Sequence, residues 1–334
     1  MAYSNSSLNC FANCMAKYNH IYNLHTPPCK PDSPHLLFGT MAHEVLYKAG
    51  VLRDETDDGV VDKEQYYDII PSEVLYNDLK EFFSINIWQE YFTPVIKQVY
   101  KYERAIINEM KELKDGPIRI DRELKLQVNS DDLKDIKPIK MSMSIVGVID
   151  LLIRTNTHCT IIDYKFSTTK KTQDDFDMNS QLPLYSLLVH KKYNIPLRNI
   201  KYGYIDIPKQ SLTRPIVLSN GTISRAKNQN VSQEMYEMAV KILHEDDPYY
   251  NCKPGGYYYD AWCNMALNKA AYLSLQYLDL DTYNNVINDL LNAVLMIEFI
   301  TDNKLPYLHK YDAYTCKSCE YVDSCKPWLY IGGE

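Results

Sequence analysis

The segment from Ile145 to Lys171 reads IVGVIDLLIRTNTHCTIIDYKFSTTKK and decides the expected fold. Two apolar, β-branched runs, Ser144–Arg154 and Cys159–Phe166, flank the short polar link Thr155–His158. Apolar runs on either side of such a link are typical of a β-hairpin. If the turn is centred on Asn156-Thr157, opposed residues have numbers that add to 313.

Three charged side chains meet in this otherwise apolar hairpin. In the predicted register Asp150 faces Asp163, and opposed residues point to the same face of a sheet. Lys165 lies two residues beyond Asp163 and shares its face. Two opposed carboxylates repel unless something neutralises them, and a divalent cation would do so. The simpler interpretation is an Asp–Lys ion pair with Asp150 in a turn.

Length and composition indicate an ordinary soluble globular protein. The chain has 334 residues, enough for one large domain or two moderate ones, with 46% hydrophobic and 24% charged residues. No apolar run approaches the roughly 20 residues that span a membrane. The N-terminus lacks the basic and apolar regions of a signal peptide. We therefore expect a cytoplasmic protein without a membrane partner, whose nine cysteines are thiols or metal ligands.

The net charge of −7 argues against indiscriminate coating of nucleic acid, but it permits a local basic groove. Basic residues do gather around the hairpin and after it, which suggests such a groove or simply a solvated face. They are Lys165, Lys170, Lys171, Lys191, Lys192, Arg198 and Lys201.

The other elements follow from hydrophobic spacing and from helix caps and breakers. The expected helices are Ser6–His25 capped by Ser6 or Ser7, Gly39–Ala49 with His43, Ser72–Leu113 broken near Pro94, Thr172–Tyr193, Ser232–His244, 261–278 and 281–302. The further strands are Ile118–Val128 and Asn199–Ile207, and Glu123 is expected to face solvent from the first of them. Strand, hairpin, helix and strand with flanking helices predict an α/β sheet sandwich.

The C-terminal tail carries Cys316, Cys319 and Cys325 within ten residues, a spacing typical of metal ligands. A tetrahedral or cubane site needs a fourth ligand. The candidates are Cys10, Cys14, Cys252 and Cys263. If Cys14 is the fourth, the site fastens the two ends of the chain together. The alternative is that the three thiols are incidental.

Taken together, these motifs resemble the RecB-type nucleases of the PD-(D/E)XK superfamily, in the iron–sulfur branch seen in AddB-like and CRISPR-associated exonucleases. The matching residues are Ser7-Leu8-x2-Phe11-x2-Cys14-x2-Lys17-Tyr18, Gly39-Thr40-Met41-Ala42-His43-Glu44, Gly147-Val148-Ile149-Asp150, Asp163-Tyr164-Lys165, Gln181-x3-Tyr185 and Cys316-x2-Cys319-x5-Cys325. Met15 stands where a proline is usual, and Asp163 where this branch more often has Glu. Segments 50–115 and 208–300 match poorly, and Pro215–Val240 resembles phage-encoded members.

The resemblance implies a fold and a set of residue roles. The fold is a restriction-endonuclease-like mixed sheet flanked by helices, with helical additions. His43, Asp150, Asp163 and the Tyr164 carbonyl would bind Mg²⁺ or Mn²⁺, and Lys165 would orient or activate a water. Gln181 and Tyr185 would position the lysine and the DNA backbone. Cys14, Cys316, Cys319 and Cys325 would hold an iron–sulfur cluster of the 4Fe-4S type, with Zn²⁺ as the alternative; Glu123 receives no role.

The implied function is a metal-dependent DNA nuclease, an exonuclease rather than an endonuclease, acting in recombination, repair or phage DNA processing. Its substrate would be DNA that is single-stranded or has a free end. The chain has no G-x-x-x-x-G-K-[ST] loop, so a helicase motor would be a separate partner. Two alternatives remain: a module that binds DNA ends or a partner without cutting, and a zinc-stapled interaction protein.

We expect one nuclease domain over residues 1–334. Its successive parts are the N-terminal cluster and histidine helices (1–50), a helical insertion (51–115), the catalytic core (116–207), a helical and loop extension (208–310) and the cysteine-bearing tail (311–334).

Overall fold

A computed structural model describes residues 2–29, 34–55, 85–137, 142–167, 172–208, 271–308, 316–317 and 319–325. Several expectations lie outside these ranges: the start of the helix from Ser72, the helix Ser232–His244, Lys170, Lys171, Cys252, Cys263 and most of the segment Pro208–Ala270. In the described part, no helix is both long and apolar enough to cross a membrane.

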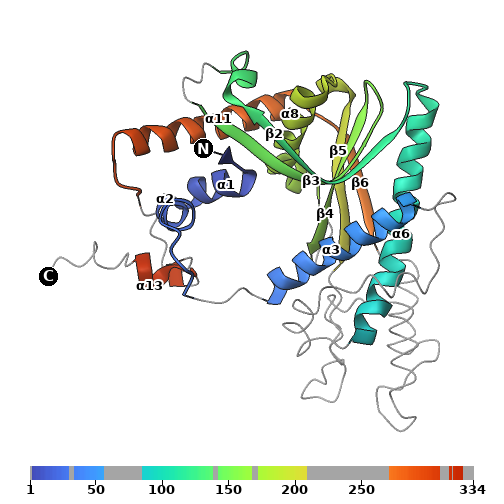
Figure 1. Ribbon diagram of the computed structural model, residues 1–334, viewed down its shortest axis with the longest axis horizontal. Helices are drawn as coiled ribbons and strands as arrows, with labels where there is room; N and C mark the ends of the chain where they lie inside the picture. Colours follow the sequence, from blue (N-terminus) through green and yellow to red (C-terminus); the bar gives the residue numbers. More distant parts are fainter. Residues whose placement is uncertain are drawn as a thin grey trace, which may run out of the picture.

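The centre of the molecule is a mixed six-stranded sheet in the order β1-β3-β4-β5-β6, with β2 paired to β3 (Figure 1). Its strands are β1 (Ala2–Tyr3), β2 (Arg119–Asn129), β3 (Ser144–Arg154), β4 (Cys159–Ser167), β5 (Ile200–Pro208) and β6 (Tyr272–Tyr277). The β2–β3, β3–β4 and β5–β6 pairs are antiparallel, whereas β1–β3 and β4–β5 are parallel. This confirms the expected α/β architecture.

The hairpin of β3 and β4 has the predicted register. Its four paired positions run from Leu151–Ile162 to Arg154–Cys159, and each pair adds to 313. Thr155 N donates to His158 O at 2.9 Å across the link. Beyond Leu151–Ile162 the ladder ends. Instead, Tyr164 N donates to a side-chain oxygen, Asp150 Oδ2, at 2.7 Å. The predicted opposed pair of Asp150 and Asp163 is therefore not part of the ladder, because the two strands separate there.

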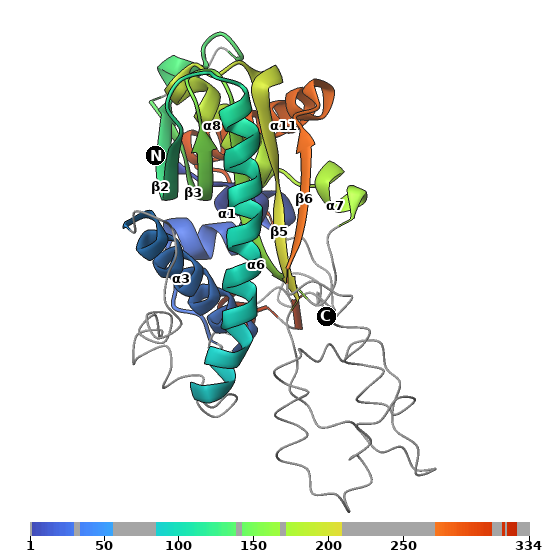
Figure 2. The ribbon, with the colours of Figure 1, turned by 90° about the vertical axis from the view of Figure 1, so that its right-hand side faces the viewer.

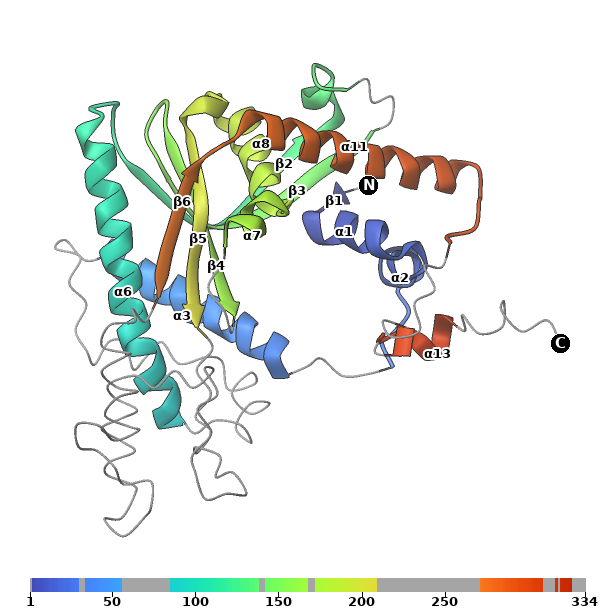
Figure 3. The same ribbon diagram turned by 180° about the vertical axis from the view of Figure 1, so that it is seen from behind.

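Helices cover both faces of the sheet. One face packs against α8 (Gln181–Tyr193), α11 (Leu280–Asp302) and α1 (Asn5–Asn13), and the other against α3 (Pro34–Glu55) and α6 (Ile85–Glu112). Figure 2 shows α3 and α6 in front of the sheet, and Figure 3 shows α8 and α11 from the opposite side. The two faces hold separate clusters of buried apolar side chains, which make the sheet the middle layer of a sandwich.

Strands β2 and β3 both exchange faces near their middle. In β3, Ile145 and Ile149 pack on the α8 side, whereas Leu151 and Ile153 pack on the α3 side. In β2 the same exchange separates Ile120 from Leu126. Alternation within a regular strand would keep residues of the same parity on one face. Glu123, with a φ of 46° in the middle of β2, is the residue at which that strand changes face.

The first helix is shorter than expected. Its cap is Ser4 rather than Ser6 or Ser7, because the Ser4 hydroxyl accepts from Ser7 N at 3.2 Å. Cys14 has extended backbone angles (φ −159°, ψ 106°), so α1 ends before it. Cys14 then caps the short helix α2 (Met15–Tyr18), its Sγ accepting from Lys17 N at 3.4 Å. A π-helical turn, Asn19–Asn23, follows.

Other boundaries also differ from the prediction. Helix α3 is longer than Gly39–Ala49, and α6 continues through Pro94 instead of breaking there. The helix expected over Thr172–Tyr193 is two helices, α7 (Gln173–Asp177) and α8, so Pro183 falls in the first turn of α8, where proline is tolerated. Residues Tyr272–Tyr277 form strand β6 rather than the end of a helix, because they pair with the open edge of β5.

The two ends of the described chain lie side by side. Cys29 N donates to Glu320 O at 2.7 Å, and Ala16 N donates to Leu308 O at 3.2 Å. Lys17 forms an ion pair of 2.9 Å with Glu320. Figure 1 shows the short helix α13 (Val322–Cys325) near α2, which places the C-terminal cysteines beside the N-terminal helices.

Candidate active site

Asp150 lies at the centre of the site, where β3 separates from β4. Its Oδ2 accepts the Tyr164 backbone N–H, which fixes the carboxylate between the two strands. Its Oδ1 lies 3.3 Å from Nδ1 of His43, and the Asp150 side chain is only 10% exposed. Asp150 therefore belongs to a strand, and the interpretation that placed it in a turn is wrong.

His43 reaches the sheet from α3. Its ring packs against Phe166 with a centroid distance of 5.4 Å and against Tyr164 at 6.3 Å. Burial disfavours the imidazolium, but the hydrogen bond to Asp150 and the charges of Asp150, Asp163 and Glu123 outweigh it and raise the pKa of His43. The aromatic contacts hold one ring nitrogen toward the carboxylates, as a metal-binding histidine requires.

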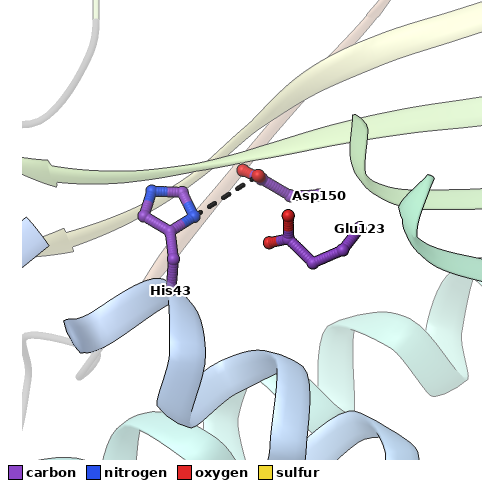
Figure 4. A group of neighbouring side chains, drawn as sticks. All are labelled: His43, Glu123 and Asp150. Atoms are coloured by element: carbon purple, nitrogen blue, oxygen red, sulfur yellow. Dashed lines mark ion pairs between the residues drawn. The ribbon is translucent and has the colours of Figure 1, made fainter. Parts of the chain in front are cut away.

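Glu123 is the site residue that sequence reasoning missed. Its carboxylate, a His43 nitrogen and an Asp150 oxygen all lie within 4.8 Å of one another, and in the described part of the chain they are the only such group of histidine, cysteine and acidic side chains. Figure 4 shows the three side chains converging from α3, β2 and β3. The sequence signal for Glu123 is an acid in mid-strand at a β2 position opposite Asp150.

A second group of polar side chains lies beside Asp150. Lys165 Nζ is 2.5 Å from Asp163 Oδ2 and donates to Gln181 Oε1 at 3.1 Å. Gln181 Nε2 lies 3.0 Å from Asp163 Oδ1 and 2.6 Å from the Tyr185 hydroxyl. Gln181 thus connects the acid, the lysine and the tyrosine. The structure brings these four predicted residues together. Of the simpler interpretation, the Asp–Lys ion pair is present, between Asp163 and Lys165, whereas the turn at Asp150 is not.

Gly147 makes room for this group. A Cβ at Gly147 would lie 2.9 Å from the ring of Tyr185 and 2.8 Å from Leu188. Helix α8 can therefore approach β3 closely, which holds Tyr185 and Gln181 over the hairpin. This is the physical reason for a glycine three residues before Asp150.

The carboxylates crowd one another. Asp163 is 2% exposed, and burial together with the charge of Asp150 raises its pKa to about 7 although Lys165 and His43 oppose the shift. Burial and the charge of Asp150 also raise the pKa of Glu123. Negative charge is thus concentrated here beyond what the nearby cations balance, which favours a bound cation.

The donor set fits a divalent metal. Two carboxylates and one imidazole suit Mg²⁺ or Mn²⁺, with the imidazole favouring the softer Mn²⁺. His43 and Asp150 are predicted ligands that the structure brings together. Asp163 is adjacent but bound to Lys165 and Gln181, outside the group of three. The backbone N–H of Tyr164 bonds to Asp150, which keeps this peptide at the site.

The cysteines form a separate group at the joined ends of the chain. Burial raises the pKa of Cys325 to about 11, and the charges of Cys14, Cys319 and Cys316 add to the shift. These sulfur atoms do not form a group within 4.8 Å of one another as His43, Glu123 and Asp150 do in the described part of the chain. Burial raises the pKa of Cys10 to about 11; the charge of Lys17 opposes the shift, and those of Cys14 and Cys319 add to it.

Of the two interpretations of the basic residues around the hairpin, a groove for nucleic acid receives little support. Lys191 bonds to both carboxylate oxygens of Asp135 at 2.6 and 2.7 Å, and Lys201 forms an ion pair with Glu109. These contacts are those of a solvated face, where opposite charges already compensate each other.

Comparison with known proteins identifies the class. The family model described as PD-(D/E)XK nuclease superfamily matches residues 2–326, almost the whole chain, and the protein belongs to that superfamily. The match includes His43, the hairpin and all three C-terminal cysteines. No curated protein matches.

Two solved structures are more distantly similar. One is described as a "putative exonuclease" from Eubacterium rectale; it is 10% identical, with a TM-score of 0.44, over 96% of this chain and 86% of that one. The other, described as SSO0001, is 15% identical, with a TM-score of 0.25, over 71% of this chain and 77% of that one.

Proposed function

We propose that this nuclease is a Mg²⁺- or Mn²⁺-dependent deoxyribonuclease and that it acts as an exonuclease. The observation that carries the proposal is the meeting of His43, Glu123 and Asp150 within 4.8 Å of one another, beside Lys165. Membership of a nuclease superfamily and a set of side chains that could hold a cation, gathered around Asp150, support the same chemistry.

His43, Glu123 and Asp150 would hold the metal, and Asp163 and the Tyr164 carbonyl would complete its surroundings. When bound, the cation would lower the pKa of a water and offset the charge that develops on the scissile phosphate. Lys165 Nζ, now 2.5 Å from Asp163, would orient this water and contribute positive charge toward the phosphate. Gln181 would hold the lysine in place through Oε1 while its amide group stays bonded to Asp163 and Tyr185.

The substrate in this proposal is DNA that is single-stranded or has a free end, cut during recombination, repair or phage DNA processing. Any helicase would be a separate protein. If the gene belongs to a phage, the enzyme would act in the cytoplasm of the host. The resemblance of the cysteine and histidine motifs to those of RecB-type nucleases supports DNA with a free end as the substrate.

We further propose that Cys14, Cys316, Cys319 and Cys325 bind a 4Fe-4S cluster, with Zn²⁺ as the competing occupant. After burial, the charges of Cys14, Cys319 and Cys316 are what raise the pKa of Cys325, and this supports a common site. The backbone hydrogen bond from Cys29 to Glu320 and the Lys17–Glu320 ion pair support a structural role, because they join the same two segments. Anaerobic purification separates the occupants: iron with sulfide supports the cluster, and stoichiometric zinc contradicts it.

The decisive experiment is hydrolysis of end-labelled single- and double-stranded DNA with Mg²⁺ or Mn²⁺, comparing wild type with Lys165→Ala. A matched control is Lys134→Ala, whose side chain is 64% exposed and pairs only with Asp131 among described contacts. We expect activity in wild type and Lys134→Ala and its loss in Lys165→Ala. Equal hydrolysis by all three would refute the catalytic assignment.

Circular DNA distinguishes the modes of cleavage, since an exonuclease needs an end. If wild type binds DNA ends without cutting under any metal condition, the alternative of a non-cleaving module is correct. That alternative is disfavoured by the complete set of Asp150, Asp163 and Lys165.

A further inference from the structure

Glu103 of α6 is a buried carboxylate on the face of the sheet opposite the Gln181 group. It is 2% exposed. Its Oε2 accepts from Nη2 of Arg53 at 2.9 Å and from Nη2 of Arg122 at 2.8 Å. Its Oε1 accepts from Nη1 of Arg122 at 3.1 Å and from the Tyr164 hydroxyl at 3.3 Å. Both carboxylate oxygens are therefore fully used.

Two partners of Glu103 come from α3 and β2, which carry His43 and Glu123, and the third comes from β4, which is hydrogen-bonded to Asp150. Arg53 lies on α3, the helix that presents His43. Arg122 precedes Glu123 in β2. Tyr164 follows Asp163 in β4, and its N–H bonds to Asp150. One buried side chain thus connects α3, β2 and β4 from beneath the site.

The linkage is tight because the partners are immobilised as well. The side chains of Arg53 and Arg122 are 3% and 5% exposed. Arg122 also donates to both oxygens of Asp54, at 2.7 and 3.2 Å, so its guanidinium is held from two sides. Burial alone would raise the pKa of Glu103, but Arg122 and Arg53 hold it below its ordinary value, and the carboxylate stays ionised. Removing one member of such a network leaves the others buried without compensation.

Gly50 of α3 supports this interpretation. A Cβ at Gly50 would lie 2.5 Å from Nε and Cζ of Arg122. The guanidinium therefore packs directly against the α3 backbone, and any side chain at position 50 would displace it. The contact fixes the distance between the His43 helix and the strand of Glu123.

We propose that Glu103 is a positioning residue for the metal site, setting the relative placement of His43, Glu123 and the β4 acid through Arg53, Arg122 and Tyr164. The inference rests on the proposed metal-dependent function. Groups that orient metal ligands without touching the metal typically change metal affinity or activity by roughly 10- to 100-fold when mutated. The hydrogen bonds of Glu103 go to its three partners and not to the carboxylates or imidazole of Glu123, Asp150 and His43.

The test is Mn²⁺ binding by isothermal titration to the full-length protein, which does not depend on DNA hydrolysis. Asp150→Asn reports loss of the site. We expect Glu103→Gln, which keeps the side-chain volume and removes the charge, to bind Mn²⁺ roughly 10- to 100-fold more weakly. The matched control is Glu298→Gln on α11: Glu298 is also a buried glutamate, 6% exposed, and accepts from a tyrosine hydroxyl, Tyr3, at 2.6 Å. It should lose stability but keep Mn²⁺ affinity.

Gly50→Ala is a second variant that keeps every charge and moves only Arg122. It should weaken Mn²⁺ binding in the same direction as Glu103→Gln, and it decides the question if Glu103→Gln fails to fold. The positioning role alone is overturned if Asp150→Asn loses Mn²⁺ binding while a folded Glu103→Gln, or Gly50→Ala, binds Mn²⁺ with wild-type affinity. Equal binding by wild type and Asp150→Asn overturns the metal site and this inference with it. Wild type that binds Mn²⁺ but leaves DNA intact contradicts only the nuclease proposal.

Discussion

Glu123 lies across from Asp150, between the paired positions Arg122–Leu151 and Leu124–Ile149, where β2 and β3 both exchange the faces to which their side chains point. The exchange depends on the φ of 46° at Glu123, a conformation that costs a non-glycine residue about 1–2 kcal/mol. Strain of this kind persists where the surrounding structure enforces it, often at functional sites. Here it brings the Glu123 carboxylate toward Asp150 and His43.

We therefore predict that removing the Glu123 side chain lowers the affinity for metal but does not lower the stability of the fold. Glu123→Gly should relieve the strained backbone, at a cost of about 0.5–1 kcal/mol for the added freedom of glycine in the unfolded chain. Its free energy of unfolding should equal or slightly exceed that of wild type, while Mn²⁺ affinity falls at least about tenfold. Urea unfolding and calorimetric titration measure the two quantities.

Two variants control this prediction. Glu123→Gln should lose Mn²⁺ affinity without the gain in stability. Lys114→Gly tests the conformational effect alone, since Lys114 follows α6 with a φ of 51°. It should gain stability with Mn²⁺ binding unchanged. Wild-type Mn²⁺ affinity in Glu123→Gly would remove Glu123 from the site.

Gln181 should matter for turnover rather than for the metal. Gln181→Ala removes the acceptor for Lys165 and the amide between Asp163 and Tyr185, so the lysine loses its orientation. Misplacement of a catalytic group by about 1 Å can cost on the order of 100-fold, and we expect a fall in kcat of that size. Mn²⁺ affinity should stay close to wild type.

Tyr185→Phe should have a smaller effect than Gln181→Ala, because it removes only the hydroxyl that meets Gln181. The control is Gln127→Ala, an exposed glutamine on β2 whose side chain bonds to Asn129. Steady-state kinetics on end-labelled DNA, with Mn²⁺ varied, separates kcat from the metal requirement. A Gln181→Ala enzyme with normal kcat and weak Mn²⁺ binding would contradict the assigned role.

The raised pKa of Asp163 predicts an unusual pH dependence of stability in the metal-free protein. The folded state binds this proton more tightly than the unfolded state, since the folded pKa is about 7. The contribution is fully present below the ordinary aspartate pKa of about 3.9 and is lost as pH rises through 7. Between pH 5 and 7.5, stability should therefore fall by on the order of 1 kcal/mol per pH unit from this group.

The comparison that isolates Asp163 is wild type against Asp163→Asn, both in EDTA, by urea unfolding at several pH values. The variant should lack this part of the slope. Above pH 5 the depressed pKa of Glu103 does not interfere, because stability from a lowered carboxyl pKa is lost only at lower pH. Parallel curves for the two proteins would contradict the shift.

The sequence predicts the hairpin well and Glu123 poorly, for reasons that are physical. The register of β3 and β4 could be derived because a short link leaves few ways to pair two apolar strands. In β2, apolar residues stand at every second position from Ile118 to Val128 except at Arg122. The apolar positions therefore stay in phase on both sides of Glu123, and this hides the exchange of faces there. A positive φ at a glutamate has no local sequence signal. The sequence therefore predicts the solvent exposure that Glu123 has, but not that its carboxylate lies beside Asp150 and His43.

The other features that the sequence does not predict depend on contacts between residues far apart in the chain. Glu103, Arg53 and Arg122 are far apart in the chain, and nothing in their local patterns distinguishes them from surface charges. The segment Tyr272–Tyr277 was expected to be helical, but the free edge of β5 recruits it as a strand. His43 was assigned through its motif rather than its helix pattern, and the structure places it 3.3 Å from Asp150.

The two N-terminal cysteines next to the tail should behave differently. Cys14 has the extended backbone that ends α1, and after burial its charge makes the largest contribution to the raised pKa of Cys325. Cys10 lies within α1, close to Cys14, Cys319 and Lys17. If Cys14 is the fourth cluster ligand, Cys14→Ser should lose iron and sulfide and Cys10→Ser should retain both. A bridge between segments this far apart constrains the unfolded chain by about 5 kcal/mol, so Tm should fall by roughly 10 °C in Cys14→Ser alone.

Anaerobic iron and sulfide analysis with thermal unfolding measures both effects. Cys159→Ala serves as a control for removal of a thiol elsewhere, because Cys159 is buried in β4 and packs in the sheet core. It should lower Tm through lost packing while iron content stays at the wild-type level. If Cys10→Ser loses iron and Cys14→Ser retains it, Cys10 and not Cys14 is the fourth cluster ligand. Full iron content in both variants would show that the fourth ligand is another residue.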